Sequence, residues 1–135
     1  MKGNKIPDQD HVARYCSPKH VSDEEIQATA FMLRPSDNSL SVNWLEYFKC
    51  LSRKSEIDEL RKAYAAKNLT VKASGGIAVL NVGEVCEKVL TESPDKRKLE
   101  ILHDPEENDP SHSGIYSLRN DDELIAELIL ETILE

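Results

Sequence analysis

Apolar and polar positions along the chain follow two different periods. Alternating runs, rich in β-branched and aromatic residues, are typical of half-buried strands. On this pattern we expect strands over residues 11–16, 28–35, 98–103 and 114–118. Pro18 and Pro35 should end the first two, because a proline cannot continue a strand ladder. Phe31 and Leu33 would be buried in the second.

Apolar residues spaced three and four positions apart predict helices. We expect helices that begin near Asn43, Ser55 and Gly83, a single helical turn over residues 22–27, and a last helix over residues 121–135. Asn43 is interpreted as an N-cap, with Glu46 three residues later in a capping arrangement.

The clearest hairpin signal is the pair Gly75-Gly76, which lies between two β-rich runs, residues 69–73 and 77–82. Strands that are interleaved with helices, with at least one hairpin, predict an α+β fold. We therefore expect a small antiparallel or mixed sheet, with helices packed on one side of it and an amphipathic helix at the C-terminus.

The chain has 135 residues, which favours one domain with a hydrophobic core of its own. Residues 1–10 have no apolar pattern and are expected to form a flexible tail, so that the domain spans residues 11–135. No apolar run approaches the roughly 20 residues that cross a bilayer, and the N-terminus lacks the apolar segment of a signal peptide. Three widely spaced cysteines, Cys16, Cys50 and Cys86, indicate reduced thiols and a cytoplasmic location.

The last expected helix has a wide apolar face. That face is made of Leu124, Ile125, Leu128, Ile129 and Ile133. Leu130 and Leu134 lie beside glutamates, outside the face. The helix therefore packs between two surfaces of its own domain, which we favour, or part of it meets another chain, as in a homodimer.

Net charge is −8, and it is concentrated in the C-terminal third of the chain. From Asp104 onwards there are ten acidic residues and one basic residue, Arg119, so this segment carries −9. Such a surface repels a phosphate backbone, and we expect no general nucleic-acid binding. The same surplus can attract a basic partner protein.

Two histidines and an aspartate flank the acidic loop between two of the expected strands. His103 and Asp104 come where one strand ends, and His112 comes just before the next strand. If the strands pair, the loop brings His112 back to His103 and Asp104. A histidine with a carboxylate can act in general acid–base catalysis or bind a divalent cation. A solvated turn, rich in Asp and Pro, is the alternative that we favour.

A second polar cluster begins the first expected strand. His11 and Arg14 could anchor an anionic substrate, since a guanidinium binds phosphate or carboxylate through two parallel hydrogen bonds. In a strand these two side chains point to opposite faces, and only a helix would place them on the same one. A surface ion pair between Arg14 and Asp10 is the simpler interpretation.

Several catalytic motifs are absent from the sequence. It has no GxxxxGK[ST], GxGxxG, HExxH or GxSxG pattern. P-loop, Rossmann, zincin and α/β-hydrolase chemistry therefore lack their signatures. The residues identify no cofactor, and whether a metal binds stays open.

The segments HVARYC, LSVNWLEYF, AVLNVG and HDPEENDPSHSGIY resemble those of a group of short, uncharacterised bacterial proteins. The resemblance covers about half of the chain and implies a bacterial cytoplasmic origin. It brings no catalytic residues with it, because no activity is established for that group.

Two functional hypotheses follow. The first is an interaction or accessory protein that binds another protein, as the uneven acidity and the apolar last helix indicate. The second is a small hydrolase or transferase that acts on a phosphoester or nucleotide. In that case His103, Asp104 and His112 would be acid–base or metal-binding groups, and His11 with Arg14 would bind the anion. We favour the first.

Overall fold

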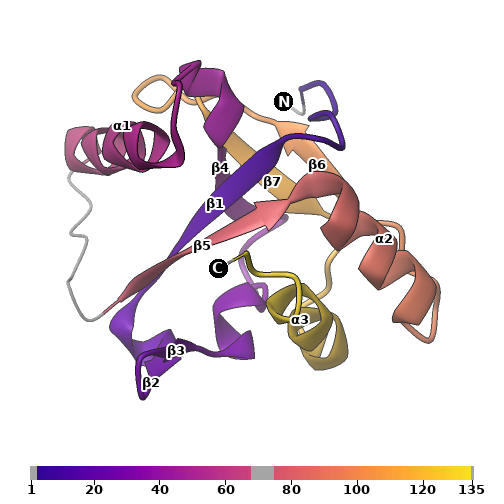
Figure 1. The fold of residues 1–135 in the computed structure, drawn as a ribbon. Coiled ribbons are helices and arrows are strands. Elements are labelled where there is room, and N and C mark those ends of the chain that lie inside the picture. Colours follow the sequence, from indigo (N-terminus) through magenta and orange to yellow (C-terminus); the bar gives the residue numbers. More distant parts are fainter. Residues whose placement is uncertain (1–2, 68–74, 135) are drawn as a thin grey trace.

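The computed structural model describes residues 3–67 and 75–134 (Figure 1). The main sheet is antiparallel, with five strands in the order β5-β1-β4-β7-β6. These strands are β1 (His11–Cys16), β4 (Leu40–Trp44), β5 (Gly76–Asn81), β6 (Glu100–His103) and β7 (His112–Tyr116). A separate small sheet pairs β2 (Val21–Ser22) with β3 (Glu25–Ile26).

Three α-helices and three short 3₁₀ helices complete the described part of the chain. The α-helices are α1 (Arg53–Ala66), α2 (Val82–Glu92) and α3 (Glu123–Leu130). The 3₁₀ helices are η1 (Pro18–His20), η2 (Ala28–Phe31) and η3 (Leu45–Phe48). The fold is α+β with a helix at the C-terminal end, as the sequence predicts.

Helices lie on both faces of the sheet, so the expectation of one covered side is wrong (Figure 1). α2 and α3 pack on one face, where alternating strand residues such as Val12 and Val42 form the main core. α1 packs on the opposite face, where Leu60 and Tyr64 join a second apolar cluster with Ala13 of β1. α1 has an apolar stripe of its own. That stripe is buried against a separate surface of the sheet.

Side-chain caps define where two of the helices begin. The Ser52 hydroxyl accepts a hydrogen bond from the backbone N–H of Ser55 at the start of α1. The Asn81 side chain accepts from the N–H of Glu84 at the start of α2. Each bond satisfies a donor that a helix terminus leaves unpaired. Both helices thus begin within two residues of the positions that the apolar spacing predicts.

Two predictions between the first strand and residue 40 are wrong. Residues 28–35 do not form a strand: η2 occupies Ala28–Phe31, and Phe31 is buried against the main core. Residues 22–27 form no helical turn, because β2 and β3 pair across Asp23 and Glu24, both with positive φ. Positive φ at both central residues is typical of a tight hairpin turn.

The interpretation of Asn43 as a helix cap is also wrong. Asn43 lies within β4, and η3 after it has no side-chain cap. Glu46, the expected partner in the capping arrangement, accepts instead from the backbone N–H of His11 at 2.7 Å. The true role of Asn43 is described with the site below.

The expected hairpin around Gly75-Gly76 falls partly outside the described residues, since residues 68–74 are not among them. Its second run forms β5, whose partner in the sheet is β1. The described part of the expected N-terminal tail lies along the outer edge of β6. There Ile6 is fully buried, and its N–H donates to the carbonyl of Ile101.

α3 buries most of its apolar face in its own domain, as we favoured. Ile125, Leu128 and Ile129 are at most 5% exposed, whereas Leu124 is 47% exposed. Dimerisation through this helix stays a prediction. Among the residues described, no helix is long and apolar enough to cross a membrane.

Candidate functional site

The turn between β6 and β7 brings together the ends of two strands, which pair with each other. His103 of β6 is directly opposite Ser113 of β7. Past that pair, the N–H of Asp104 donates to the carbonyl of His112 at 2.9 Å. Asp104 and His112 are therefore neighbours across the start of the turn.

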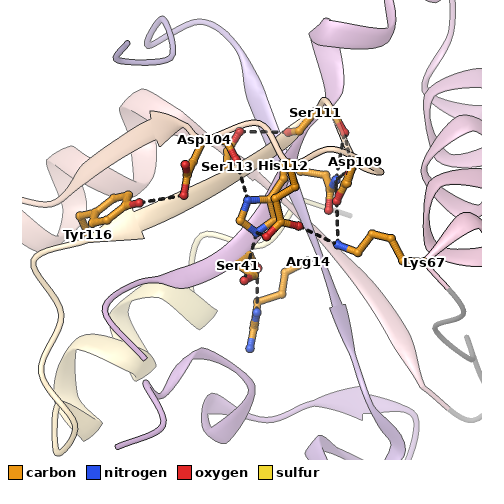
Figure 2. A network of polar contacts seen from close by, with 11 residues as sticks. Arg14, Ser41, Lys67, Asp104, Asp109, Ser111, His112, Ser113 and Tyr116 are labelled. Carbon is orange, nitrogen blue, oxygen red and sulfur yellow. Dashed lines mark hydrogen bonds and ion pairs between the residues drawn. The ribbon is translucent and has the colours of Figure 1, made fainter. Parts of the chain in front are cut away.

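An open groove of about 860 Å³ lies beside this turn, on the α1 side of the sheet. Figure 2 shows the polar side chains near the turn, among them Ser41, Asp104 and His112. One wall is the connection that leads into β4, and the other is formed by β7 and the residues on either side of it. The lining residues that carry charge or chemistry are Arg34, Asp37, Ser41, Asp104, Glu106, His112 and Tyr116. Two of the predicted site residues, Asp104 and His112, thus share one concave surface.

His112 is held by two hydrogen bonds and is only 8% exposed. Its Nδ1 lies 2.9 Å from the carbonyl oxygen of Asp104. Its Nε2 lies 3.2 Å from Oγ of Ser41, on the neighbouring strand β4. The ring is therefore fixed in orientation, and its second nitrogen meets a hydroxyl that lines the groove.

Asp104 presents a carboxylate to the groove. Its Oδ2 accepts a hydrogen bond from the Tyr116 hydroxyl at 3.1 Å. Burial raises the pKa of Tyr116 above its ordinary value. No Lys or Arg within the described ranges forms an ion pair with Asp104. The other two groove carboxylates each have a cationic partner: Asp37 pairs with Arg34 and Glu106 with Lys67.

Behind the groove lies a buried carboxylate, Asp109, whose side chain is 0% exposed. It accepts hydrogen bonds from the Asn43 amide and from the Ser111 hydroxyl. Nζ of Lys67, just after α1, lies 2.9 Å from its Oδ2. Removal from water lowers the pKa of Lys67, but hydrogen bonds and the charges of Asp109 and Glu106 outweigh it and raise that pKa. The network connects α1, β4 and the β6–β7 turn.

Gly114 lies in β7 directly opposite Ser41, which lines the groove. A Cβ at this position would lie 2.8 Å from Oγ of Ser39 and 2.9 Å from the ring of Tyr116. Both side chains would have to move. We expect Gly114→Ala to lower the free energy of unfolding by about 1–3 kcal/mol, measured by urea denaturation. Gly76→Ala is the control, since its Cβ would only contact Ile26 at 3.4 Å; an equal loss in both variants would contradict this role for Gly114.

His103 does not join His112 in the groove. Because successive strand residues point to opposite faces, the register that pairs His103 with Ser113 directs His112 to the other side. His103 packs on the rings of Trp44 and Tyr47, with centroid distances of 5.1 and 5.4 Å. Its Nε2 lies 2.7 Å from the carbonyl oxygen of Pro110. These contacts are those of a packed structural histidine.

The second predicted pair, His11 and Arg14, also makes contacts with other parts of the protein. Nδ1 of His11 lies 2.6 Å from the Glu46 carboxylate. Arg14 donates to the backbone carbonyls of Ala30 and Ser41, each at 2.7 Å, and burial lowers its pKa. The expected pair of Arg14 with Asp10 is replaced by these carbonyl contacts. Neither His11 nor Arg14 lines the groove that holds His112.

The groove also contains residues that sequence reasoning missed, chiefly Ser41 and Tyr116. Both lie in strands at positions that alternate with apolar residues, a pattern that indicates only a solvent-facing strand surface. They form a site only through contacts with residues of neighbouring segments, and those neighbours cannot be identified from the sequence without the strand order. Among the residues that the structure describes, no group of three or more His, Cys, Asp or Glu side chains is placed to hold a metal ion.

The fold and groove together define a small α+β protein with an acidic polar groove on a partly covered sheet face. The chain matches no protein-family model, no curated protein and no solved structure. The resemblance to short bacterial proteins stays a prediction, and the function must be argued from the groove itself.

Proposed function

We propose that the protein is a small accessory protein that binds a basic segment of a partner protein in this groove. The observation that carries the proposal is the carboxylate of Asp104, which lines the groove and has no ion-pair partner among the described residues. Asp37 and Glu106 line the same surface, but each lies beside its own cation, Arg34 and Lys67, so Asp104 carries the unbalanced negative charge. A Lys or Arg side chain entering the groove would meet Asp104 as its counter-ion.

The acidic surface continues beyond the groove. The side-chain amide of Asn120 donates to the carbonyl of Arg34 at 3.0 Å, so the approach to α3 lies against the groove wall. Exposed Asp121 and Glu123 follow directly. Asp121 and Glu123 thus add negative charge near one end of the groove, at the start of a helix that packs on the other face of the sheet. The net charge of −8 supports association with a basic partner by long-range attraction.

A phosphoester hydrolase or transferase built on all five predicted residues has less support. The carboxylate of Asp104, which has no ion-pair partner among the described residues, would repel a phosphate group unless a cation intervened. His103 packs on aromatic rings, and His11 pairs with Glu46. The anion-binding and acid–base parts of that hypothesis therefore do not occupy the groove together.

A labelled octalysine peptide, followed by fluorescence anisotropy, tests the proposal. We expect saturable binding at low salt that weakens steeply as salt is raised, because the attraction between exposed charges is screened. The double variant Asp104→Asn/Glu106→Gln should weaken binding about 10-fold, by loss of roughly 1.4 kcal/mol of charge attraction. Octaglutamate should not bind.

The matched control is Glu84→Gln/Glu87→Gln, which removes the same charge from α2. These two residues are exposed and belong to the helix that packs on the opposite face of the sheet. The control variant should bind octalysine like the wild type. Equal weakening in both double variants would show only a general charge effect and would contradict a binding groove.

The setting that we propose is a bacterial cytoplasm. All three cysteines are free thiols, which supports a reducing compartment. A homodimer that uses the exposed Leu124 of α3 is compatible with the groove, since α3 packs on the other face of the sheet. Light scattering of the purified protein would show whether it forms.

A further inference from the structure

We propose that Ser41 and His112 form a nucleophile–base pair that hydrolyses small carboxylic esters in the groove. This goes beyond peptide binding and rests on a different observation, the hydrogen bonding of the His112 ring (Figure 2).

The tautomer of neutral His112 follows from its contacts. A backbone carbonyl oxygen can only accept a hydrogen bond, so Nδ1, which faces the Asp104 carbonyl at 2.9 Å, must carry the hydrogen. Nε2 then has the lone pair, and it lies 3.2 Å from Oγ of Ser41. The Ser41 hydroxyl therefore donates its hydrogen to Nε2. Nucleophile, base and orienting acceptor follow one another in the order that an activated serine needs.

The position of Ser41 leaves its oxygen accessible from the groove. Ser41 is exposed and lies directly opposite Gly114 of β7, which has no side chain to cover it. His112 is 8% exposed, so the base is shielded from bulk water while the nucleophile is not. The carbonyl of Ser41 accepts a hydrogen bond from Arg14, which holds the strand at this residue.

The reaction balances with water as the only co-reactant. Oγ of Ser41 attacks the ester carbonyl carbon while its proton passes to Nε2 of His112. The bond from that carbon to the alkoxy oxygen then breaks, and the alcohol leaves with the proton from Nε2. Water attacks the acyl-serine in the same way, giving up a proton to Nε2. The carboxylic acid leaves, and the proton returns to Oγ of Ser41.

The charge of the groove selects among esters. The carboxylate of Asp104, which has no cationic partner among the described residues, disfavours an anionic acyl group, so the substrates are neutral or cationic esters. p-Nitrophenyl acetate is a neutral probe, and p-nitrophenyl hydrogen succinate is its anionic counterpart. After correction for the rate of each ester in buffer alone, we expect p-nitrophenyl acetate to be hydrolysed about 10-fold faster than p-nitrophenyl hydrogen succinate.

Ser41→Ala tests the nucleophile. Because Ser41 is exposed, this variant should fold, which circular dichroism would verify. Its rate with p-nitrophenyl acetate should fall about 100-fold or to the buffer background, as is typical for loss of acid–base-assisted catalysis. A fluorophosphonate probe should label wild-type Ser41, identified by peptide mass spectrometry, and should fail to label the variant.

Ser36→Ala is the matched control, because Ser36 also lines the groove and has no histidine contact among the described residues. It should keep both the rate and the labelling. His112→Gln should lose both while Ser41 is still present; if it does not fold, the Ser41→Ala comparison decides alone. An unlabelled, inactive wild-type protein, or a Ser41→Ala variant as active as the wild type, would overturn the proposal.

Discussion

Replacing Asp109 with alanine should lower the free energy of unfolding by about 3 kcal/mol. The Asp109 carboxylate is fully buried and is the shared acceptor for Lys67, Asn43 and Ser111. Its removal leaves the buried Asn43 amide without this acceptor and leaves Lys67 with only the exposed Glu106. Since domains of this size are stable by only about 5–15 kcal/mol, urea denaturation should show a large shift in the midpoint.

The control for Asp109 is Glu106→Gln, which removes the other, half-exposed carboxylate of Lys67. We expect it to cost less than about 1 kcal/mol, as exposed pairs usually do. The pKa of Lys67 is raised in the folded protein, so the stability from its pairing is complete below the unfolded pKa and is lost as pH rises through the folded pKa. If Asp109→Ala costs no more than Glu106→Gln, the buried network does not connect α1 to the turn as described.

Replacing Phe31 with alanine should cost about 3–5 kcal/mol. Phe31 is one of the largest fully buried side chains and is 1% exposed. It lies in η2, which packs against α3. The cavity left by the ring would lie between that helix and the main core. Thermal unfolding followed by circular dichroism measures the loss.

Leu51→Ala is the matched control for Phe31→Ala. Leu51 lies between η3 and α1 and is fully exposed. Its truncation should change the free energy of unfolding by less than about 0.5 kcal/mol. Similar losses in the two variants would contradict the placement of η2 in the core.

The parts of the fold that the sequence predicts are those set by local chemistry. The apolar stripes of α1 and α2 place the start of each helix to within two residues, and the structure adds the caps, Ser52 and Asn81. The alternation in residues 98–103 and 114–118 predicts two strands, and the structure shows that they pair across the acidic loop as β6 and β7. In contrast, the apolar run from Ala28 to Phe31 is short, and tertiary contact with α3 decides that it becomes η2.

The candidate site is less predictable, because its contacts join distant segments. Asn43 binds Asp109 across 66 residues, and Lys67 binds it across 42. Asparagine is also a common helix-capping residue, so the local pattern alone assigns Asn43 the role of a cap instead of its role as a donor to Asp109. Ser41 contacts His112 only because β4 and β7 are neighbouring strands. The periodicity of a strand does not indicate which strand lies next to it in the sheet.

The measurement that tests the central claim most directly is the mapping of octalysine binding on the ¹⁵N-labelled protein by amide chemical shifts. The account predicts that the largest shifts fall on residues 37–41, 104–106 and 112–117, the two walls of the groove, and that Asp104→Asn/Glu106→Gln reduces them. Shifts of equal size on α2, or spread over all acidic surfaces, would show that the groove is not a specific binding site.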